Sequence, residues 1–431
     1  MEQISFKLLQ DADLKNKIVL VRVDHNVVKK GLIHDPYRID ATLGTLFYII
    51  AKGGKIILMT HVGRPKDKKT GNIHIEAGSS VQPIVNYLET KLHIKLGVPE
   101  FEAIEKKGYA GIETSINHLI RDLRESKIDG IYLPNTRWFA GEESKGNERD
   151  RFAYQLAGLA DIYVNDAFGS WQAHASTVSI TKYLPSYAGF LMQKELQNLD
   201  RIYDPKRPFV AVVAGAKFDT KIESLTALLK VADYLILGGV IYNAYLCAKY
   251  GIEIKGVEKE DIEQAKQFVE ICKQYPEKLI ELPFIVESDS MDNKTEGAFR
   301  TLDIRNLKAG ATLNYVLDAA KESFADSQVY DVFHQAKTIF VNAVMGYMPY
   351  FNEGTIALDE LIDENLDAVK LYGGGDTMQE LKRLLPGLYI VALDDPKYYI
   401  FTGGGAVLKA IQEGTYMGLE PVKALCVNSE I

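Results

Sequence analysis

The chain has 431 residues, of which 47% are hydrophobic and 25% are charged, the composition of an ordinary water-soluble protein. This length is too great for one ordinary hydrophobic core and predicts two or three domains. Lys and Arg number 50 and Asp and Glu number 58, which leaves a net charge of −8. That balance argues against nucleic acid or an anionic membrane as a partner of the surface as a whole.

The three cysteines, Cys247, Cys272 and Cys426, stand far apart and lack the spacing of a zinc site. Neither a disulfide framework nor a zinc centre is therefore expected. No run of about 18 uninterrupted apolar residues occurs, and the first residues carry no basic region that leads into an apolar core. We therefore expect a cytoplasmic protein without a membrane segment.

In the first half of the chain, predicted strands end on polar or cationic residues. Apolar runs typical of buried strands occur at 17–24, 55–60, 129–133 and 162–165. Helices are predicted over 39–50, 81–91, 116–124 and 152–159, a loop over 66–72 and a charged surface segment over 141–151. Open parallel sheets bind ligands at the carboxyl ends of their strands. The residues that follow these strands are therefore candidates for a binding site.

Arg38, Arg64 and Arg137 stand at or near such strand ends. A single arginine of this kind most often forms a salt bridge at the surface. Three of them at corresponding ends of neighbouring strands could instead bind a phosphate or carboxylate in bidentate fashion. His61 and His174 are as easily hydrogen-bonded packing residues as ligands.

Residues 189–203 read as one long helix, which Asp204-Pro-Lys-Arg-Pro208 ends. A helix between two sheet domains is a candidate hinge, and we place the domain boundary here.

A strand over 209–213, a helix beginning near Asp219 or Thr220 and a strand over 234–237 form a unit typical of parallel sheets. Lys217 follows the first strand, and Lys221 lies four residues later at the start of the helix. Two ammonium groups beside the N–H groups at a helix start would suit a polyphosphate. The alternative is that both lysines are solvated surface charges.

The remaining sequence continues the alternation of strands and helices. Strands are predicted over 279–286, 337–342, 367–372 and 398–401, and helices over 261–275, from Met378 and after Thr402. The glycine runs at 373–375 and 403–405 could expose backbone N–H groups to phosphates, or could be tight turns only. Asp376 could be a helix cap or a ligand of Mg²⁺.

The chain resembles the phosphoglycerate kinase family through a series of separated motifs. In chain order these are VRVDHN, YRIDATLGT, HVGRP, NTRWFAGEE, VNDAFG with AHAST, GFLMQKEL, AGAKFDTK, YGGGDT and FTGGGA. The resemblance implies an α/β fold with two Rossmann-like three-layer αβα domains, mainly parallel sheets and a hinge helix. It implies a phosphoglycerate-binding domain (1–188), a hinge helix and linker (189–207), a nucleotide-binding domain (208–401) and a segment that returns to the first domain (402–431).

The reaction implied is reversible phosphoryl transfer between 1,3-bisphosphoglycerate and ADP, which yields 3-phosphoglycerate and ATP with Mg²⁺. By the resemblance, the phosphoglycerate-binding residues are Asp24, Asn26, Arg38, His61, Arg64 and Arg137. The nucleotide-binding residues are Lys217, Lys221, Asn342, Gly374, Gly375, Asp376 and Thr377, with Asp376 at the metal. Arg38, Lys217 and Gly375 are the implied catalytic residues, and a monomer is expected.

Phosphoryl transfer needs in-line positioning and neutralisation of the equatorial oxygens, and no covalent participation by the protein. Arg38 and Lys217 are expected to reach the transferring group from different domains. Closure about the hinge is expected to exclude water from the acyl phosphate.

The chain departs from the family pattern at three places. Trp171-Gln172-Ala173-His174 replaces a longer segment with His-Arg-Ala-His, so one arginine for the substrate phosphate is missing. Asn342–Pro349 lacks the glutamate that holds the nucleotide ribose, for which Glu353 is a candidate substitute. Asp318–Glu322 replaces an Asp-Ile-Gly-Pro-Lys turn. These changes bear on nucleotide affinity and base preference more than on phosphoryl transfer.

Two hypotheses follow. The favoured one is an active, divergent phosphoglycerate kinase, because Arg38, Lys217 and Asp376 are all present. The alternative is a non-catalytic protein that binds nucleotide or phosphoglycerate on the same scaffold.

Overall fold

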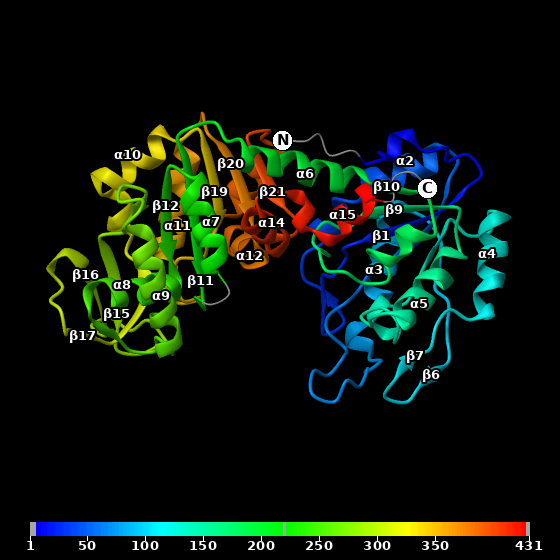
Figure 1. Ribbon diagram of the computed structural model, residues 1–431, viewed down its shortest axis with the longest axis horizontal. Helices are drawn as coiled ribbons and strands as arrows, with labels where there is room; N and C mark the ends of the chain where they lie inside the picture. Colours follow the sequence, from blue (N-terminus) through cyan, green and yellow to red (C-terminus); the bar gives the residue numbers. More distant parts are fainter. Residues whose placement is uncertain (1–5, 219–220, 428–431) are drawn as a thin grey trace. The chain divides into compact units, whose positions relative to one another are not determined.

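The computed structural model describes residues 6–218 and 221–427. The chain divides into two compact units (Figure 1). Unit 1 comprises the residues up to Leu196 together with the segment that begins at Tyr416, and unit 2 comprises Gln197–Thr415.

In unit 1, the described residues form one parallel sheet of six strands. In sheet order these are β10 (Ser186–Ala188), β9 (Ile162–Asp166), β1 (Ile18–Val23), β4 (Lys55–Met59), β8 (Gly130–Tyr132) and β5 (Leu96–Gly97). Every residue of β1 is buried, as expected of a central parallel strand covered on both faces. The strands predicted at 17–24, 55–60, 129–133 and 162–165 are thus confirmed as four neighbours in one sheet.

Helices and short hairpins surround this sheet. They are α1 (Tyr37–Asp40), α2 (Leu43–Ala51), α3 (Gln82–Leu92), α4 (Asn117–Arg124), α5 (Asn147–Ala157), and the hairpins β2 (Val28–Lys29) with β3 (Leu32–Ile33) and β6 (Ala103–Ile104) with β7 (Gly108–Tyr109). The core of the unit joins the strands to the helices through residues such as Val21, Ile49, Leu58, Ile84 and Leu88.

Unit 2 contains a second parallel sheet, also of six strands within the part of the chain that the structure describes. In sheet order these are β14 (Leu279–Ile280), β12 (Tyr234–Gly238), β11 (Phe209–Gly215), β19 (Thr338–Asn342), β20 (Val369–Gly373) and β21 (Tyr398–Phe401). The predicted parallel pairing of the strands at 209–213 and 234–237 is confirmed, with Val212 beside Ile236.

The helices of unit 2 form two layers. One contains α7 (Ile222–Val231), which packs against α9 (Lys259–Cys272) and α14 (Gly404–Glu413), with α8 (Gly239–Tyr250) beside α9. The other contains α10 (Ser327–Gln335), α11 (Glu353–Glu364), α12 (Gly375–Leu384) and α13 (Pro386–Asp394), each in contact with the next. Right-handed crossovers between parallel strands place these layers on opposite faces of the sheet. The predicted three-layer α/β architecture is confirmed (Figure 1).

A small antiparallel sheet also belongs to unit 2. Its strands are β16 (Phe299–Asp303), β15 (Phe284–Ser288) and β18 (Tyr315–Ala319), with the short pair β13 (Glu253–Ile254) and β17 (Thr312–Leu313) elsewhere in the unit. The single strand predicted over 279–286 is therefore wrong, because β14 and β15 belong to different sheets. Pro283 lies between them and has no N–H group to continue a ladder.

The single helix predicted over 39–50 is also wrong, because the structure has α1 and α2 there. The N–H group of Thr42 bonds to the carbonyl of Ile39, three residues back, at 3.1 Å. The Thr42 hydroxyl donates to the same carbonyl at 2.8 Å and lies 2.9 Å from Nε2 of His25. These bonds stabilise a tighter turn between the two helices.

Two helices begin earlier than predicted. α5 begins at Asn147, so the segment 141–151 is not simply a charged surface: Glu142 within it is fully buried. α12 begins at Gly375 rather than at Met378, which places Asp376 and Thr377 in the first helical turn. The predicted cap at Asp219 or Thr220 lies outside the described residues.

Helix α6 (Phe190–Tyr203) is continuous as predicted, and the division between the two units falls within it. Its action as a hinge remains a prediction. Near the other end of the chain, α15 (Glu420–Val427) packs against β10 and the 3₁₀ helix η5 (Ser179–Lys182) of unit 1. None of the described helices combines the length and the apolar character that crossing a bilayer requires.

We expect Leu425→Ala to lower the free energy of unfolding of unit 1 by about 2–5 kcal/mol, because Leu425 is 1% exposed and its removal leaves a cavity. Both tryptophans of the chain, Trp138 and Trp171, lie in unit 1, so denaturation followed by tryptophan fluorescence measures this unit. Lys423→Ala, at an exposed position on α15, should change the free energy of unfolding of unit 1 by less than about 0.5 kcal/mol. Equal denaturation midpoints for Leu425→Ala and Lys423→Ala would contradict the packing of α15 on the rest of unit 1.

Candidate active site

In unit 1, the strands β9, β1, β4 and β8 are adjacent and parallel, so their carboxyl ends lie along one edge of the sheet. The predicted residues that follow β1 and β4 meet at this edge. Oδ1 of Asn26 accepts a hydrogen bond from the N–H group of Gly63 at 2.8 Å. This bond joins the segment after β1 to the turn after β4.

Asp24 is 4% exposed and pairs with Arg38, whose Nη1 lies 3.4 Å from Oδ2 of Asp24. The second oxygen of this carboxylate, Oδ1, is buried and has no hydrogen-bond partner within the described chain. A buried carboxylate oxygen without a donor is unfavourable in a protein interior. Asp24 therefore retains an acceptor for a ligand hydroxyl.

Arg137 is held in place by two contacts. Its Nη1 donates to the carbonyl of Gly63 at 2.6 Å, and its Nε lies 2.8 Å from Oε1 of Glu143. Burial lowers the pKa of Arg137, and the positive charges of Arg22 and Arg64 act in the same direction. Arg64 itself is exposed.

His61 lies among cationic side chains. Burial holds its pKa well below the ordinary value, and the charges of Arg22, Arg137, His174 and Arg38 lower it further. Arg38 and Arg137, two of the three arginines predicted at neighbouring strand ends, therefore lie close enough to His61 to affect its pKa. A neutral imidazole in this position can donate a hydrogen bond to an anion that the arginines attract.

Three residues of this region were not among the predicted site residues. Arg22 is fully buried and contacts His61, and Ser176 and Glu142 are fully buried next to it. A signal for Arg22 was present in the sequence, because an arginine inside the apolar run Ile18–Val23 requires a buried partner. Nothing in the sequence links it to Glu142 or Ser176.

The loop that departs from the family motif is anchored from several sides. The carbonyl of Ala173 accepts a hydrogen bond from Nη1 of Arg149 at 3.0 Å, and the N–H group of His174 donates to the Thr177 hydroxyl at 3.0 Å. Burial lowers the pKa of His174, against the opposing effect of Glu142 and other nearby carboxylates. His174 is thus partly buried beside the cationic edge.

In unit 2, hydrogen bonds join the carboxyl ends of three adjacent strands. Nζ of Lys221, which follows β11, donates to Oδ1 of Asn342 at 2.6 Å. Nδ2 of Asn342, the last residue of β19, donates to the carbonyl of Gly373 at 2.6 Å. Burial lowers the pKa of Lys221 to about 8, and the charge of Asp376 partly opposes this. Lys221, Asn342 and Asp376, which the resemblance assigns to the nucleotide, therefore lie close together.

Two glycine-rich turns follow β20 and β21. Gly374 has φ of +119°, and a side chain there would come within 2.8 Å of Nδ2 of Asn342 and 3.0 Å of the Thr377 hydroxyl. A side chain on Gly404 would come within 2.5 Å of the Gly374 backbone. Both positions therefore require glycine, which the sequence alone could not separate from an ordinary tight turn.

The first N–H groups of α12 have no partner within the helix, and its positive dipole end lies at Gly375. Gly375 has open space around it, Asp376 is exposed and Thr377 is buried. Lys217 lies exposed on the segment after β11. Free N–H groups, a glycine turn and lysines are the features by which proteins bind polyphosphates.

Glu353, the candidate substitute for the ribose glutamate, is the first residue of α11 and forms an ion pair with Lys294. Next to it, Oδ2 of Asp318 accepts from the N–H group of Gly354 at 3.1 Å, and burial raises the pKa of Asp318 to about 7. The carboxylate of Glu353 is thus already paired, and its contact with a ribose remains a prediction.

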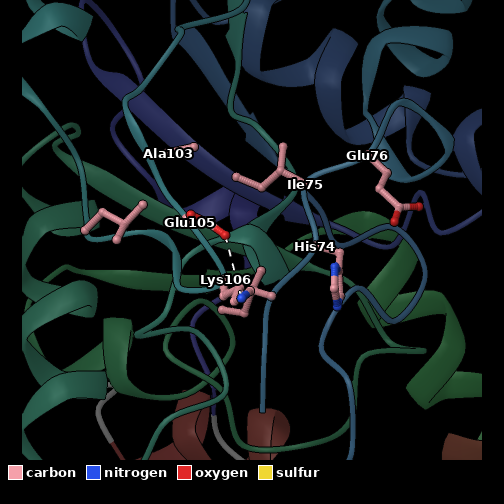
Figure 2. A pocket seen from close by; sticks show the side chains of 8 residues that line it. His74, Ile75, Glu76, Ala103, Glu105 and Lys106 are labelled. Carbon is pink, nitrogen blue, oxygen red and sulfur yellow. Dashed lines mark ion pairs between the residues drawn. The ribbon is translucent and has the colours of Figure 1, made fainter. Parts of the chain in front are cut away.

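A hollow of about 400 Å³ lies apart from these residues in unit 1, between residues 73–76 and the hairpin of β6 and β7 (Figure 2). Its walls combine Ile73 and Ile104 with charged groups such as Glu105 and Lys106, which are 3.7 Å apart. None of the predicted site residues lines it, so it is not the candidate active site.

Comparison with known proteins adds independent findings. The sequence model of a family described as "Phosphoglycerate kinase" matches residues 9–414. The phosphoglycerate kinase of Dictyoglomus turgidum is 33% identical over 410 residues, which cover 94% of this chain and 95% of that protein. The phosphoglycerate kinase of Enterococcus faecalis is 32% identical over 425 residues, which cover 96% and 98%.

Solved structures of phosphoglycerate kinases are similar to this chain over nearly its whole length. The phosphoglycerate kinase of Coxiella burnetii superposes with a TM-score of 0.74 and 28% identity, covering 99% of this chain and all of that one. The phosphoglycerate kinase of Pyrococcus horikoshii superposes with a TM-score of 0.77 over 98% of this chain and 99% of that one. At 23% identity, this second structure speaks for the fold alone.

We expect ADP binding to take up a fraction of a proton in the pH range just above 8. The pKa of Lys221 is about 8 in the free protein, and a bound polyphosphate favours the ammonium form and raises it. Affinity should therefore fall as pH rises through this range. Calorimetry in two buffers of different ionisation enthalpy measures the uptake.

Lys221→Met should remove this proton uptake, and Lys230→Met, at an exposed position on α7, the helix that follows Lys221, should preserve it. Equal proton uptake in both variants would show that Lys221 does not face the anion.

Proposed function

The chain belongs to the phosphoglycerate kinase family, and from this premise we propose which of its residues perform the reaction. The reaction is reversible phosphoryl transfer between 1,3-bisphosphoglycerate and ADP, which gives 3-phosphoglycerate and ATP. The family match over residues 9–414 carries this conclusion.

We propose that unit 1 binds the phosphoglycerate. The residues assigned to it are Asp24, Asn26, Arg38, His61, Arg64 and Arg137. Phosphoglycerate carries a carboxyl group, a hydroxyl group and a phosphate. The buried, unpartnered Oδ1 of Asp24 suits the hydroxyl, and the positive charges around His61 suit the two anionic ends. Arg137, fixed by Gly63 and Glu143, would hold its guanidinium in one orientation.

We propose that unit 2 binds the phosphates of the nucleotide. The residues assigned to it are Lys217, Lys221, Asn342, Gly374, Gly375, Asp376 and Thr377. The hydrogen bonds from Lys221 to Asn342 and from Asn342 to Gly373 support this assignment, because they hold an ammonium group beside the first turn of α12. A helix start of this kind stabilises phosphate through its N–H groups.

Arg38, Lys217 and Gly375 are proposed to act on the transferring group itself. A guanidinium, an ammonium and a backbone N–H can neutralise the equatorial oxygens as the bond to one oxygen breaks and the bond to the other forms. The acceptor is a carboxylate in one direction and a phosphate oxygen of ADP in the other. Neither acceptor carries a proton that must be removed, so no general base is needed.

Mg²⁺ fits the residues that follow β20. The described part of the chain has no group of three or more His, Cys, Asp or Glu side chains that could hold a metal by itself. Magnesium is commonly held by one or two carboxylates together with substrate phosphates. We propose Asp376 as that carboxylate, since it lies close enough to Lys221 to affect its pKa. The bound ion would neutralise charge on the phosphates.

We further propose a monomer in the cytoplasm. Cys247, Cys272 and Cys426 are not joined in disulfides in the structure, the state that a reducing compartment maintains. The monomeric state is carried over from the family resemblance. Sedimentation velocity at several protein concentrations tests it, and a species of twice the chain mass would contradict it. Cell fractionation tests the compartment, and recovery outside the cytoplasmic fraction would contradict that assignment.

A coupled assay with 3-phosphoglycerate and MgATP tests the function. We expect turnover by the pure protein, and we expect Lys217→Ala to lower kcat by at least roughly a hundredfold, the effect of losing one charge-stabilising donor. Lys230→Ala, at an exposed position on α7, is the matched control. Near-normal turnover by Lys217→Ala would remove Lys217 from the mechanism.

Asp376→Asn should raise the Mg²⁺ concentration needed for half-maximal nucleotide binding by roughly tenfold or more, since even a residue that only supports a metal ligand has this effect. Calorimetric titration of ADP at several Mg²⁺ concentrations measures it without turnover. Asp394→Asn, at an exposed site on α13, should leave the Mg²⁺ dependence unchanged. An unaltered dependence in Asp376→Asn would exclude this carboxylate from the metal site.

A further inference from the structure

Arg22 carries a permanent positive charge inside unit 1. It lies on the central strand β1 and its side chain is 0% exposed. Within the described chain, no carboxylate forms an ion pair with it. Its guanidinium donates instead to the Ser176 hydroxyl at 2.9 Å from Nε, to the Val23 carbonyl from Nη1, and to Nδ1 of His61 at 3.1 Å from Nη2.

The contact with His61 determines where the imidazole carries its proton. An arginine side chain has only donors and keeps its charge in proteins. Nδ1 of His61 must therefore accept with its lone pair, and the ring proton must lie on Nε2. A doubly protonated imidazolium would place N–H against N–H across 3.1 Å.

The orientation of Arg22 is itself maintained by a buried network. The Ser176 hydroxyl accepts from Arg22 and donates to Oε1 of Glu142 at 2.6 Å. Oε2 of Glu142 accepts from the N–H group of Ser176 at 3.0 Å, and the carbonyl of Glu142 accepts from the N–H group of Ala175 at 3.0 Å. Glu142 is fully buried, so solvent does not compete for these bonds. The guanidinium is thereby held in one orientation toward His61.

The other nitrogen of His61 is available. Among the described residues, Nε2 forms no hydrogen bond with the protein. The charged or titratable groups that face this ring are Arg22, Arg137, His174 and Arg38. Each of these groups lowers the pKa of the ring, and the carboxylates nearby are paired with the arginines, Asp24 with Arg38 and Glu143 with Arg137. A neutral ring with its proton on Nε2 is a hydrogen-bond donor for an anionic ligand.

We propose that Arg22 is a positioning residue that holds His61 as the neutral tautomer protonated on Nε2, so that this N–H donates to the bound phosphoglycerate. Glu142 and Ser176 support Arg22 in this role. The proposal rests on the assignment of His61 to the phosphoglycerate site, but the state of the ring can be measured without any substrate.

Nitrogen-15 NMR of the full chain provides that measurement, with the His61 signals identified by their loss in His61→Gln. We expect an Nδ1 shift typical of an unprotonated nitrogen and an Nε2 shift typical of a protonated one, with no change from pH 8 down to pH 5.5. A proton on Nδ1, or titration near the ordinary value of 6.5, would overturn the proposal.

Arg22→Met should remove the contact that fixes the tautomer of His61. We expect mixed tautomers, because the donor that keeps the lone pair of His61 on Nδ1 is removed. Arg121→Met, an exposed arginine of the same unit, should reproduce the wild-type spectrum. A folded Arg22→Met protein with the wild-type His61 spectrum would overturn the role of Arg22.

If Arg22→Met does not fold, Ser176→Ala serves instead. This variant deletes only the hydroxyl that joins Arg22 to Glu142, and we expect mixed His61 tautomers in it. An unchanged spectrum would overturn the supporting role of Ser176 and Glu142.

In the coupled assay, the folded Arg22 or Ser176 variant should raise KM for 3-phosphoglycerate by roughly tenfold, with a smaller effect on kcat, as expected when a group that orients a binding residue is lost. An unchanged KM would show that the tautomer of His61 does not affect the binding of 3-phosphoglycerate. If the spectra are as expected but 3-phosphoglycerate does not bind the wild-type chain, the assignment of the site fails and the tautomer result stands.

Discussion

Buried positive charge at the carboxyl edge of each parallel sheet is the constraint on which both proposed sites depend. A cation withdrawn from water is costly unless acceptors surround it. For Arg22 the acceptors are a hydroxyl, a carbonyl and an imidazole nitrogen, and for Lys221 the acceptor is the Asn342 amide. All of these acceptors are neutral. They accept hydrogen bonds from the cations but carry no charge. The nearest opposite charges named by the structure are Asp376, which acts on Lys221, and Glu142, which lies behind Ser176 beside Arg22.

The parallel sheets make this arrangement possible because adjacent strands end at the same edge. In unit 1, β1 and β4 place Arg22 and His61 within contact. In unit 2, β19 and β20 place Asn342 beside Gly373, and the close approach of Gly404 to Gly374 leaves no room for a side chain. Polar contacts between strand ends therefore position the groups, while glycine lets the backbone approach.

Two predicted elements were wrong because a single residue interrupts the element that the apolar pattern indicates. The periodicity of 39–50 is helical, but Thr42 bonds back to Ile39 and to His25, which belongs to another segment. The run 279–286 is mostly apolar and strand-like, but Pro283 within it divides it between two sheets. The late start predicted for α12 arose because glycines are poor helix formers, although they form the first turn that would meet the phosphates.

The sequence by itself determined the parallel α/β class, the strands that end on polar residues and the membership of the family, because apolar runs and separated motifs are local properties of the chain. Through the family resemblance, it also assigned Lys221, Asn342 and Asp376 to one nucleotide-binding set. Only the tertiary structure decided that Arg22 meets Ser176, 154 residues away, and that Glu142 is buried behind them. No local pattern records such a contact, because it exists only when the fold brings the two segments together and removes both from water.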